Sequence, residues 1–105
     1  MKHLKIYKEL SEPEIGDYVI CNWRNADDEH EANIFIRNNI GQIINIIKYS
    51  MNSHIIRYDN IPADLHMYTA ASDSTAFRLA RQDILKFSKN REELEMYINL
   101  NKFNI

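Results

Sequence analysis

Residues 40–62 of this 105-residue chain read IGQIINIIKYSMNSHIIRYDNIP and predict a β-hairpin. The runs 40–49 and 55–61 are rich in isoleucine and tyrosine, which favour the half-buried surface of a strand. The five residues between them have the length of a common hairpin loop. Pro62 cannot donate a hydrogen bond to a sheet, so the second strand ends there. Gly41, alone near the start of the first strand, indicates a bulge or the close approach of another backbone segment.

Each face of the first strand mixes isoleucine with polar side chains, because alternate residues point to opposite faces. Neither face is purely apolar, so we expect both to be partly covered, as in a small curled barrel. Further short strands are predicted on both sides of the hairpin, at residues 18–23, 34–37, 77–81 and 83–88. The segment 63–76, rich in Ala, Ser, Thr and Asp, is predicted to be a long loop with at most one helical turn.

The clearest helix signals lie in residues 88–102. Ser88 or Asn90 can cap the helix start, and Glu92 and Glu93 suit the positive end of the helix dipole. Its apolar residues recur at intervals of three and four and form one stripe: Leu94, Tyr97 and Ile98.

Length and composition indicate one domain of ordinary globular type. Of the 105 residues, 45% are hydrophobic and 27% charged, enough for a modest core. The chain divides into an N-terminal arm (1–14), a β-rich body (15–87) and the C-terminal helix (88–102). No apolar run approaches the roughly 20 residues that span a bilayer, and the N-terminus lacks the apolar segment of a signal peptide. We therefore expect a cytoplasmic protein without membrane contact.

Two segments resemble the strand openings of chromo-, Tudor- and KOW-type barrels: Ile15-Gly16-Asp17-Tyr18-Val19 and Asn39-Ile40-Gly41-Gln42-Ile43. This resemblance covers residues 15–61 and implies an α+β, mainly β fold: a small SH3-like barrel of about five strands, with a C-terminal helix and an N-terminal arm. The whole chain also resembles small open reading frames of phages and large viruses, which end in a helix like Ser88–Glu95. That second resemblance implies no activity. Abundant isoleucine and asparagine, whose codons are AT-rich, agree with a phage or bacterial gene.

An acidic loop is predicted over residues 24–33, after the first strand. Clustered carboxylates suit hard cations, but this string lacks the alternating ligands and the glycine of a calcium loop. A solvated loop face is the simpler interpretation. As a functional hypothesis, the loop presents carboxylates to a basic groove on a partner protein, beside an exposed tryptophan. The predicted partner-binding residues are Trp23, Asp27, Asp28, Glu29 and Glu31.

Two further sets of residues leave alternatives open. Some aromatic side chains either line a groove for cationic or proline-rich ligands or belong to the core: Tyr18, Trp23, Phe35, Tyr49 and Tyr58. Basic and aromatic side chains on a common face would suit phosphate contact and base stacking: Arg37, Lys48, Tyr49, Arg57 and Tyr58. The formal net charge of −2 favours scattered solubilising charge over this nucleic-acid surface.

The single cysteine, Cys21, excludes an internal disulfide and lies among apolar residues of a predicted strand. It could form a nucleophilic pair with His30, His54 or His66. Free cysteine is among the most buried residue types, however, which favours a structural thiol. No histidine has a partner at metal-ligand spacing, and no serine has the context of a nucleophile elbow. The sequence therefore predicts neither an enzyme nor a bound cofactor.

Together these patterns predict a non-enzymatic protein-interaction module of a phage or mobile element. It would bind and modulate a host protein, for example as an anti-CRISPR-type inhibitor of host defence. The alternative is a small-barrel nucleic-acid-binding protein. The oligomeric state stays open, because an exposed edge strand could pair with a second copy.

Overall fold

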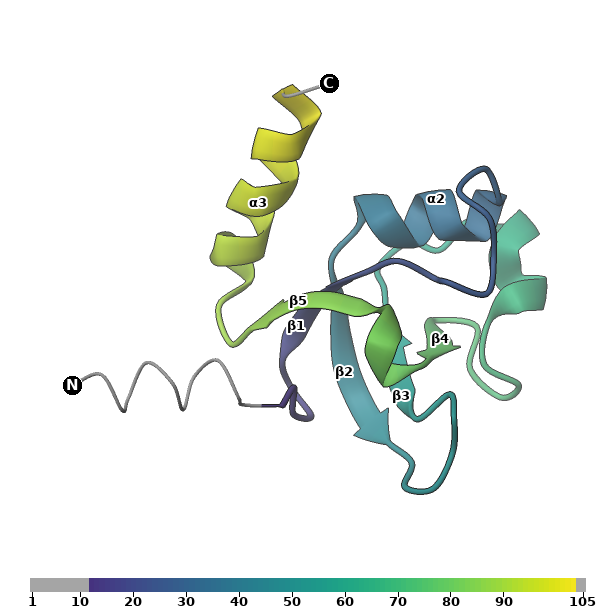
Figure 1. Cartoon of the computed structure of the whole chain (residues 1–105). Coiled ribbons are helices and arrows are strands. Elements are labelled where there is room, and N and C mark those ends of the chain that lie inside the picture. Colours follow the sequence, from purple (N-terminus) through teal and green to yellow (C-terminus); the bar gives the residue numbers. More distant parts are fainter. Residues whose placement is uncertain (1–11, 104–105) are drawn as a thin grey trace.

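The computed structural model describes the backbone of residues 12–103 and the side chains of residues 12–100 (Figure 1). Most of the predicted N-terminal arm, residues 1–11, lies outside the described residues. Five antiparallel strands form one sheet in the order β4-β3-β2-β1-β5. The strands are β1 (Tyr18–Cys21), β2 (Gly41–Ile46), β3 (His54–Arg57), β4 (Ala76–Leu79) and β5 (Ile84–Ser88).

The strand order follows the chain except at β5, which returns to pair with β1 on the far side from β2. Strands β4 and β5 are therefore the two edges of the sheet. In the described part of the chain no ladder joins them, so the sheet is not closed into a barrel. The chain is an α+β protein built on an open, five-stranded antiparallel sheet.

The predicted central hairpin is confirmed as β2 and β3. Ile43 pairs with Ile56, and both side chains are buried. A bulge shifts the register of the ladder just after Ile43. The connecting loop spans residues 47–53 and is longer than predicted; it is closed by the Ile47 N–H, which donates to the Ser53 carbonyl at 2.7 Å.

Gly41 opens β2 opposite Val19 of β1. The expected close approach is present, but it is made by side chains rather than by another backbone segment. A Cβ atom at this position would lie 2.8 Å from Cζ of Tyr58 and would also overlap Cγ2 of Ile56. Glycine is the residue that lets β2 pass this close to the core.

The strand predicted at residues 34–37 is wrong, because this segment belongs to the helix α2 (Glu31–Asn38). Isoleucine and phenylalanine favour strands, but burial at helical spacing outweighs that preference. The buried residues of α2 share one face: Ala32, Asn33 and Ile36. His30 caps the helix, because its Nδ1 accepts the N–H of the second helical residue at 3.1 Å.

The elements after the hairpin agree with the predictions, with small shifts of their ends. The strands predicted at 77–81 and 83–88 correspond to β4 and β5, joined by the 3₁₀ helix η2 (Arg81–Asp83). The long loop predicted at 63–76 contains one short helical element, the 3₁₀ helix η1 (Ala63–Tyr68).

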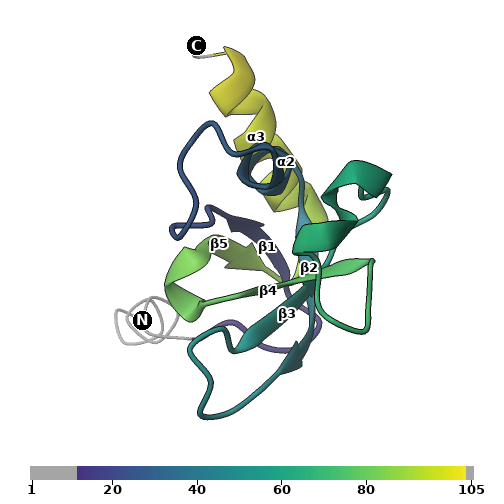
Figure 2. The same ribbon diagram turned by 90° about the vertical axis from the view of Figure 1, so that its right-hand side faces the viewer.

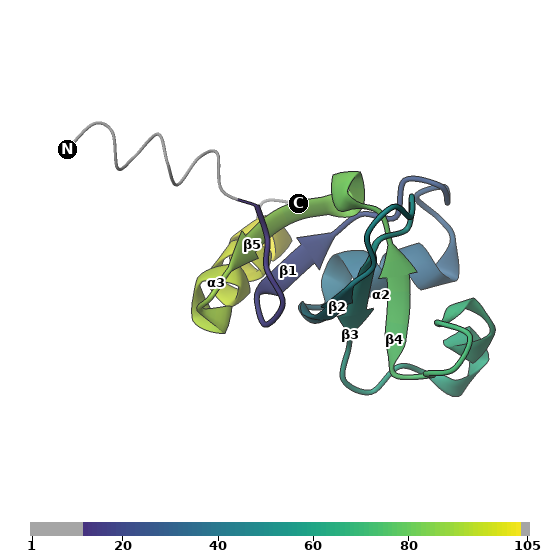
Figure 3. The ribbon, with the colours of Figure 1, turned by 90° about the horizontal axis from the view of Figure 1, so that it is seen from below.

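The helix α3 (Arg91–Phe103) confirms the predicted C-terminal helix. Asn90 caps it, because the Asn90 Oδ1 accepts the Glu92 N–H at 2.9 Å. Figure 3 shows α3 alongside β5 and β1, which are the strands it contacts. Among described residues, no helix has both the length and the apolar character needed to cross a bilayer.

Both faces of the sheet bury apolar side chains. Val19 belongs to the main core, between the sheet and α2, whereas Ile20 belongs to a smaller core under α3, because successive strand residues point to opposite faces. Figure 2 views α2 almost along its axis, above β1 and β2. The predicted apolar stripe of α3 supplies the smaller core: Leu94 is buried, and Tyr97 and Ile98 pack against it.

Candidate protein-interaction surface

The connection between β1 and α2 is held in place by Asn33, a fully buried residue of α2. Its Oδ1 accepts the Trp23 N–H at 2.8 Å. Its Nδ2 donates to the Asn22 Oδ1 at 3.0 Å and to the Asp27 carbonyl at 3.3 Å. One buried amide thus fixes three points of the connection, which explains how a polar segment of this length keeps a defined shape.

Asp83 of η2 holds the start of the same connection. Its buried carboxylate accepts the Arg24 N–H at 3.1 Å and the Ala80 N–H at 2.9 Å. The Asp83 carbonyl also accepts the Asn22 N–H at 2.8 Å. The start of the connection, at Asn22 and Arg24, is therefore tied to η2.

Three aromatic rings meet where this connection approaches η1. The ring centres of Trp23 and His30 lie 5.5 Å apart, those of His30 and Tyr68 4.8 Å, and those of Trp23 and Tyr68 6.4 Å. Each pair packs edge to face, with interplanar angles between 67° and 76°. We call these half-buried residues the aromatic cluster. Since His30 Nδ1 accepts the N-cap hydrogen bond, its ring orientation is set by the start of α2.

Four exposed carboxylates lie next to the aromatic cluster along the chain, and we call them the acidic rim: Asp27, Asp28, Glu29 and Glu31. Asp27 Oδ1 accepts the Glu29 N–H at 3.2 Å, which turns the backbone here. Arg37 donates from Nη2 to the Asp28 carbonyl, so this cation supports the loop through its backbone. The carboxylates of the rim remain free to face solvent or a partner.

A shallow groove of about 390 Å³ adjoins the acidic rim at Glu31. It lies between α2 and η1 and is lined by apolar side chains, among them Ile34, Phe35 and Leu65. The Ile34 side chain is 44% exposed. Carboxylates, aromatic rings and an apolar groove therefore follow one another around this end of the molecule.

The predicted partner-binding residues lie on one continuous segment that runs from Trp23 to Glu31 at the start of α2, and Asn33 fixes the backbone of this segment at Trp23 and Asp27. Sequence reasoning missed two members of this surface, His30 as an aromatic neighbour and Tyr68, which comes from η1. Of the other members of the predicted aromatic groove, Phe35 lines the groove beside Glu31 and also contacts the main core. Phe35 and Tyr58 pack with Phe77 in the main core, with ring centres 5.7–6.3 Å apart.

The predicted nucleic-acid set is not assembled as a stripe. Tyr58 is only 2% exposed, so its assignment as a base-stacking residue is wrong. It continues the inward face of β3 after Ile56 and therefore belongs to the core. The remaining residues come from three separate places: Arg37 from α2, Lys48 and Tyr49 from the β2–β3 loop, and Arg57 from the opposite end of β3.

Cys21 is fully buried in the main core, which confirms its interpretation as a buried thiol. Burial raises the pKa of the Cys21 thiol to about 12. We expect Cys21 of the folded chain to resist alkylation at pH 8, where on the order of one thiol in ten thousand is ionised. Mass spectrometry after iodoacetamide treatment checks this, with the chain in denaturant as the reactive control. Rapid modification of the folded chain would contradict it.

His54 is buried at the start of β3, where its Nδ1 lies 2.7 Å from the Ser53 hydroxyl. Burial, and then the charge of Arg81, lower the pKa of His54 below its ordinary 6.5, while Glu12 acts in the opposite direction. Just below pH 6.5, His54 is therefore protonated in the unfolded chain and still neutral in the folded chain. We expect stability to fall as the pH falls through this window.

Urea denaturation between pH 7.5 and 5 tests the contribution of His54. The His54→Gln variant should lose part of the slope of unfolding free energy against pH, whereas the matched variant of the exposed His66, His66→Gln, should keep it. Equal slopes in the two variants would contradict the assignment.

Comparison with protein-family models, curated proteins and solved structures gives no significant match for this chain. Within the described residues, no group of three or more histidine, cysteine, aspartate or glutamate side chains is placed to hold a metal ion.

Proposed function

We propose that this chain is a non-enzymatic protein-interaction module with an SH3-like fold, and that its aromatic cluster and acidic rim bind a basic surface of a partner protein. The strand order supports the SH3-like assignment, since a curved antiparallel meander ends with β5 returning to β1. Small size, AT-rich codon usage, the lack of a catalytic motif in the sequence and the resemblance to phage open reading frames are together the grounds for proposing an accessory protein that modulates a host protein in the cytoplasm, for example by inhibiting host defence.

One observation carries the proposal: Trp23, His30 and Tyr68 form a half-buried aromatic cluster directly beside exposed carboxylates. Aromatic faces attract cationic side chains, and carboxylates pair with them. Tryptophan and tyrosine are also over-represented among residues that dominate binding energy at interfaces. The surface therefore suits an arginine- or lysine-bearing partner.

The test is an affinity purification from host lysate with two matched charge reversals, Glu29→Lys in the acidic rim and Glu95→Lys on exposed α3. We expect a stoichiometric protein partner that resists nuclease treatment, is lost with Glu29→Lys and is retained with Glu95→Lys. Partners that disappear with nuclease would favour the nucleic-acid alternative. A partner retained equally by both variants would move binding away from the acidic rim.

A further inference from the structure

Strand β5 (Ile84–Ser88) forms an edge of the sheet and, in the described part of the chain, pairs with β1 alone. The backbone N–H and C=O groups on its other side therefore have no strand partner there. Such an edge is a template for pairing with another extended segment. Edges are usually protected, so the surroundings of β5 decide whether this one is accessible.

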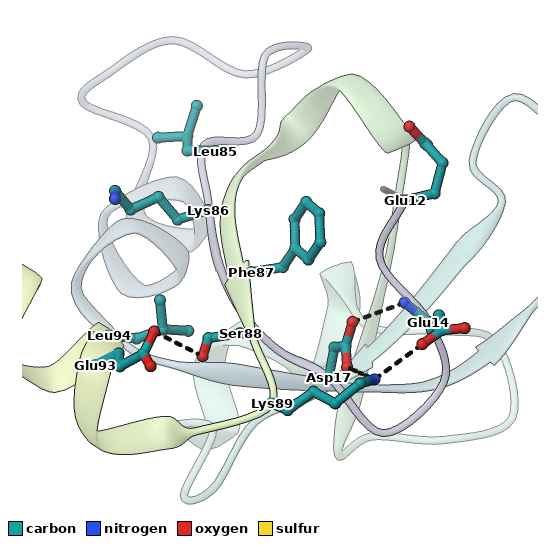
Figure 4. A pocket seen from close by; sticks show the side chains of 10 residues that line it. All are labelled: Glu12, Glu14, Asp17, Leu85, Lys86, Phe87, Ser88, Lys89, Glu93 and Leu94. Atoms are coloured by element: carbon teal, nitrogen blue, oxygen red, sulfur yellow. Dashed lines mark hydrogen bonds and ion pairs between the residues drawn. The ribbon is translucent and has the colours of Figure 1, made fainter. Parts of the chain in front are cut away.

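A groove of about 1040 Å³ surrounds β5 (Figure 4). One wall comes from Glu12, Glu14 and Asp17, and the other from Glu93 and Leu94 at the start of α3. Figure 4 shows β5 crossing the groove with the Phe87 ring on the side of Glu12 and Asp17 and with Lys86 on the opposite side. Side chains alternate between the two walls over Lys86–Ser88, and a bulge at Leu85 interrupts this alternation, so a strand added beside 86–88 would direct alternate side chains toward the two walls.

Lysine side chains commonly protect an edge strand, but the two lysines here are held aside. The Lys86 ammonium lies 4.8 Å from the centre of the Tyr97 ring on α3. The Lys89 ammonium lies 2.8 Å from Asp17 and 2.9 Å from Glu14. With both cations engaged, the edge is left with Leu85, which is 52% exposed.

The charge of the groove selects its occupant. Four carboxylates line it, against the ammonium groups of Lys86 and Lys89 and the guanidinium of Arg81, whose Nε lies 2.8 Å from Glu12. Lys89 is shared between two of the carboxylates, and Glu93 accepts its hydrogen bond from the neutral Ser88 hydroxyl at 3.1 Å. An incoming basic side chain would relieve this excess of negative charge, whereas an acidic one would increase it.

We propose that β5 accepts an extended, lysine- or arginine-bearing segment of a partner protein as a sixth strand of the sheet. Backbone hydrogen bonds along β5 supply affinity on both sides of the bulge at Leu85, and the acidic walls supply selectivity. This site is separate from the aromatic cluster and does not depend on the function proposed above.

The test begins with selection of binders from a displayed library of random decapeptides by the full-length chain. We expect enrichment of peptides in which lysine or arginine alternates with β-branched or aromatic residues. A synthetic copy of an enriched peptide should shift the amide NMR signals of residues 84–88. The same peptide with alternate backbone nitrogens methylated should bind at least tenfold more weakly, because it cannot complete a β-ladder.

Two neighbouring glutamates in the first turn of α3 give matched variants: Glu93 lines the groove and Glu92 does not. Glu93→Lys should weaken peptide binding about tenfold and Glu92→Lys less than twofold, with both variants folded by circular dichroism. Equal effects of the two variants would overturn the proposal, as would a library that yields no binders or binders without basic residues. Two further results would assign the groove to this chain itself and equally overturn the proposal. One is a dimer in ultracentrifugation whose amide NMR signals at residues 84–88 shift on dimerisation. The other is a set of nuclear Overhauser contacts from residues 1–11 to β5.

Discussion

Replacement of Gly41 by alanine should lower the free energy of unfolding by about 3 kcal/mol, close to the largest effect of a single added methyl group. The new Cβ would lie 2.8 Å from the Tyr58 ring and would overlap the Ile56 methyl group. Both side chains are buried in the main core and have little room to move. Urea denaturation followed by circular dichroism measures the loss.

Gly16→Ala is the matched control for Gly41→Ala. Gly16 has a φ of +98°, but a Cβ there would meet no atom within 4 Å, so only backbone strain of about 1–2 kcal/mol is expected. The double variant Gly41→Ala/Ile56→Ala should lose less unfolding free energy than the sum of the losses of the two single variants. The reason is that Ile56→Ala removes the methyl group that the new Cβ would overlap. A cost of Gly41→Ala no greater than that of Gly16→Ala would contradict steric exclusion by the core.

Replacement of Asn33 by alanine should also cost about 3 kcal/mol, since it leaves the Trp23 N–H and the Asp27 carbonyl without their buried partner. The same change should loosen the connection that carries the acidic rim. Trp23 is the only tryptophan, so its fluorescence reports this connection directly. We expect a red shift of Trp23 emission in conditions where circular dichroism still shows a folded sheet.

Asn38→Ala tests whether the loss is specific to Asn33. Asn38 lies on the same helix, but its side chain is exposed and donates only to the Ile34 carbonyl, so a cost below about 1 kcal/mol is expected. Fluorescence of Trp23 should be unchanged in this variant. Similar losses and similar emission in the two variants would mean that Asn33 does not organise the connection.

Strands and the C-terminal helix could be predicted from the sequence because their signals are local. Two isoleucine-rich runs and a polar loop predict the hairpin. The cap at Asn90 and the apolar stripe that begins at Leu94 predict α3. Helix α2 was missed because one of its three buried positions, Asn33, is polar. A buried asparagine looks like a loop residue until the backbone groups that it satisfies are known.

Part of the candidate surface, Trp23 and the acidic rim, could be predicted from the sequence. Trp23 and the acidic rim lie within nine residues of one another, so their proximity follows from chain connectivity. Tyr68 joins them only because η1 packs against α2. The burial of Tyr58 could have been predicted from the sequence. Tyr58 lies two residues after Ile56, so both side chains point to the same face of the sheet, and a buried Ile56 implies a buried Tyr58.

The central hairpin, the two strands that follow it, the terminal helix and the burial of Cys21 could be inferred from the sequence alone, because side-chain periodicity, turn residues and hydrophobicity act over a few neighbours. Tertiary structure decided that residues 31–38 are helical, that the sheet stays open between β4 and β5, and that Trp23, His30 and Tyr68 meet. These outcomes depend on the buried hydrogen bonds of Asn33 and on contacts between segments far apart in the chain, such as the hydrogen bond from the Arg24 N–H to Asp83. These hydrogen bonds and contacts stabilise the chain only after the segments have come together, so no local sequence pattern predicts them.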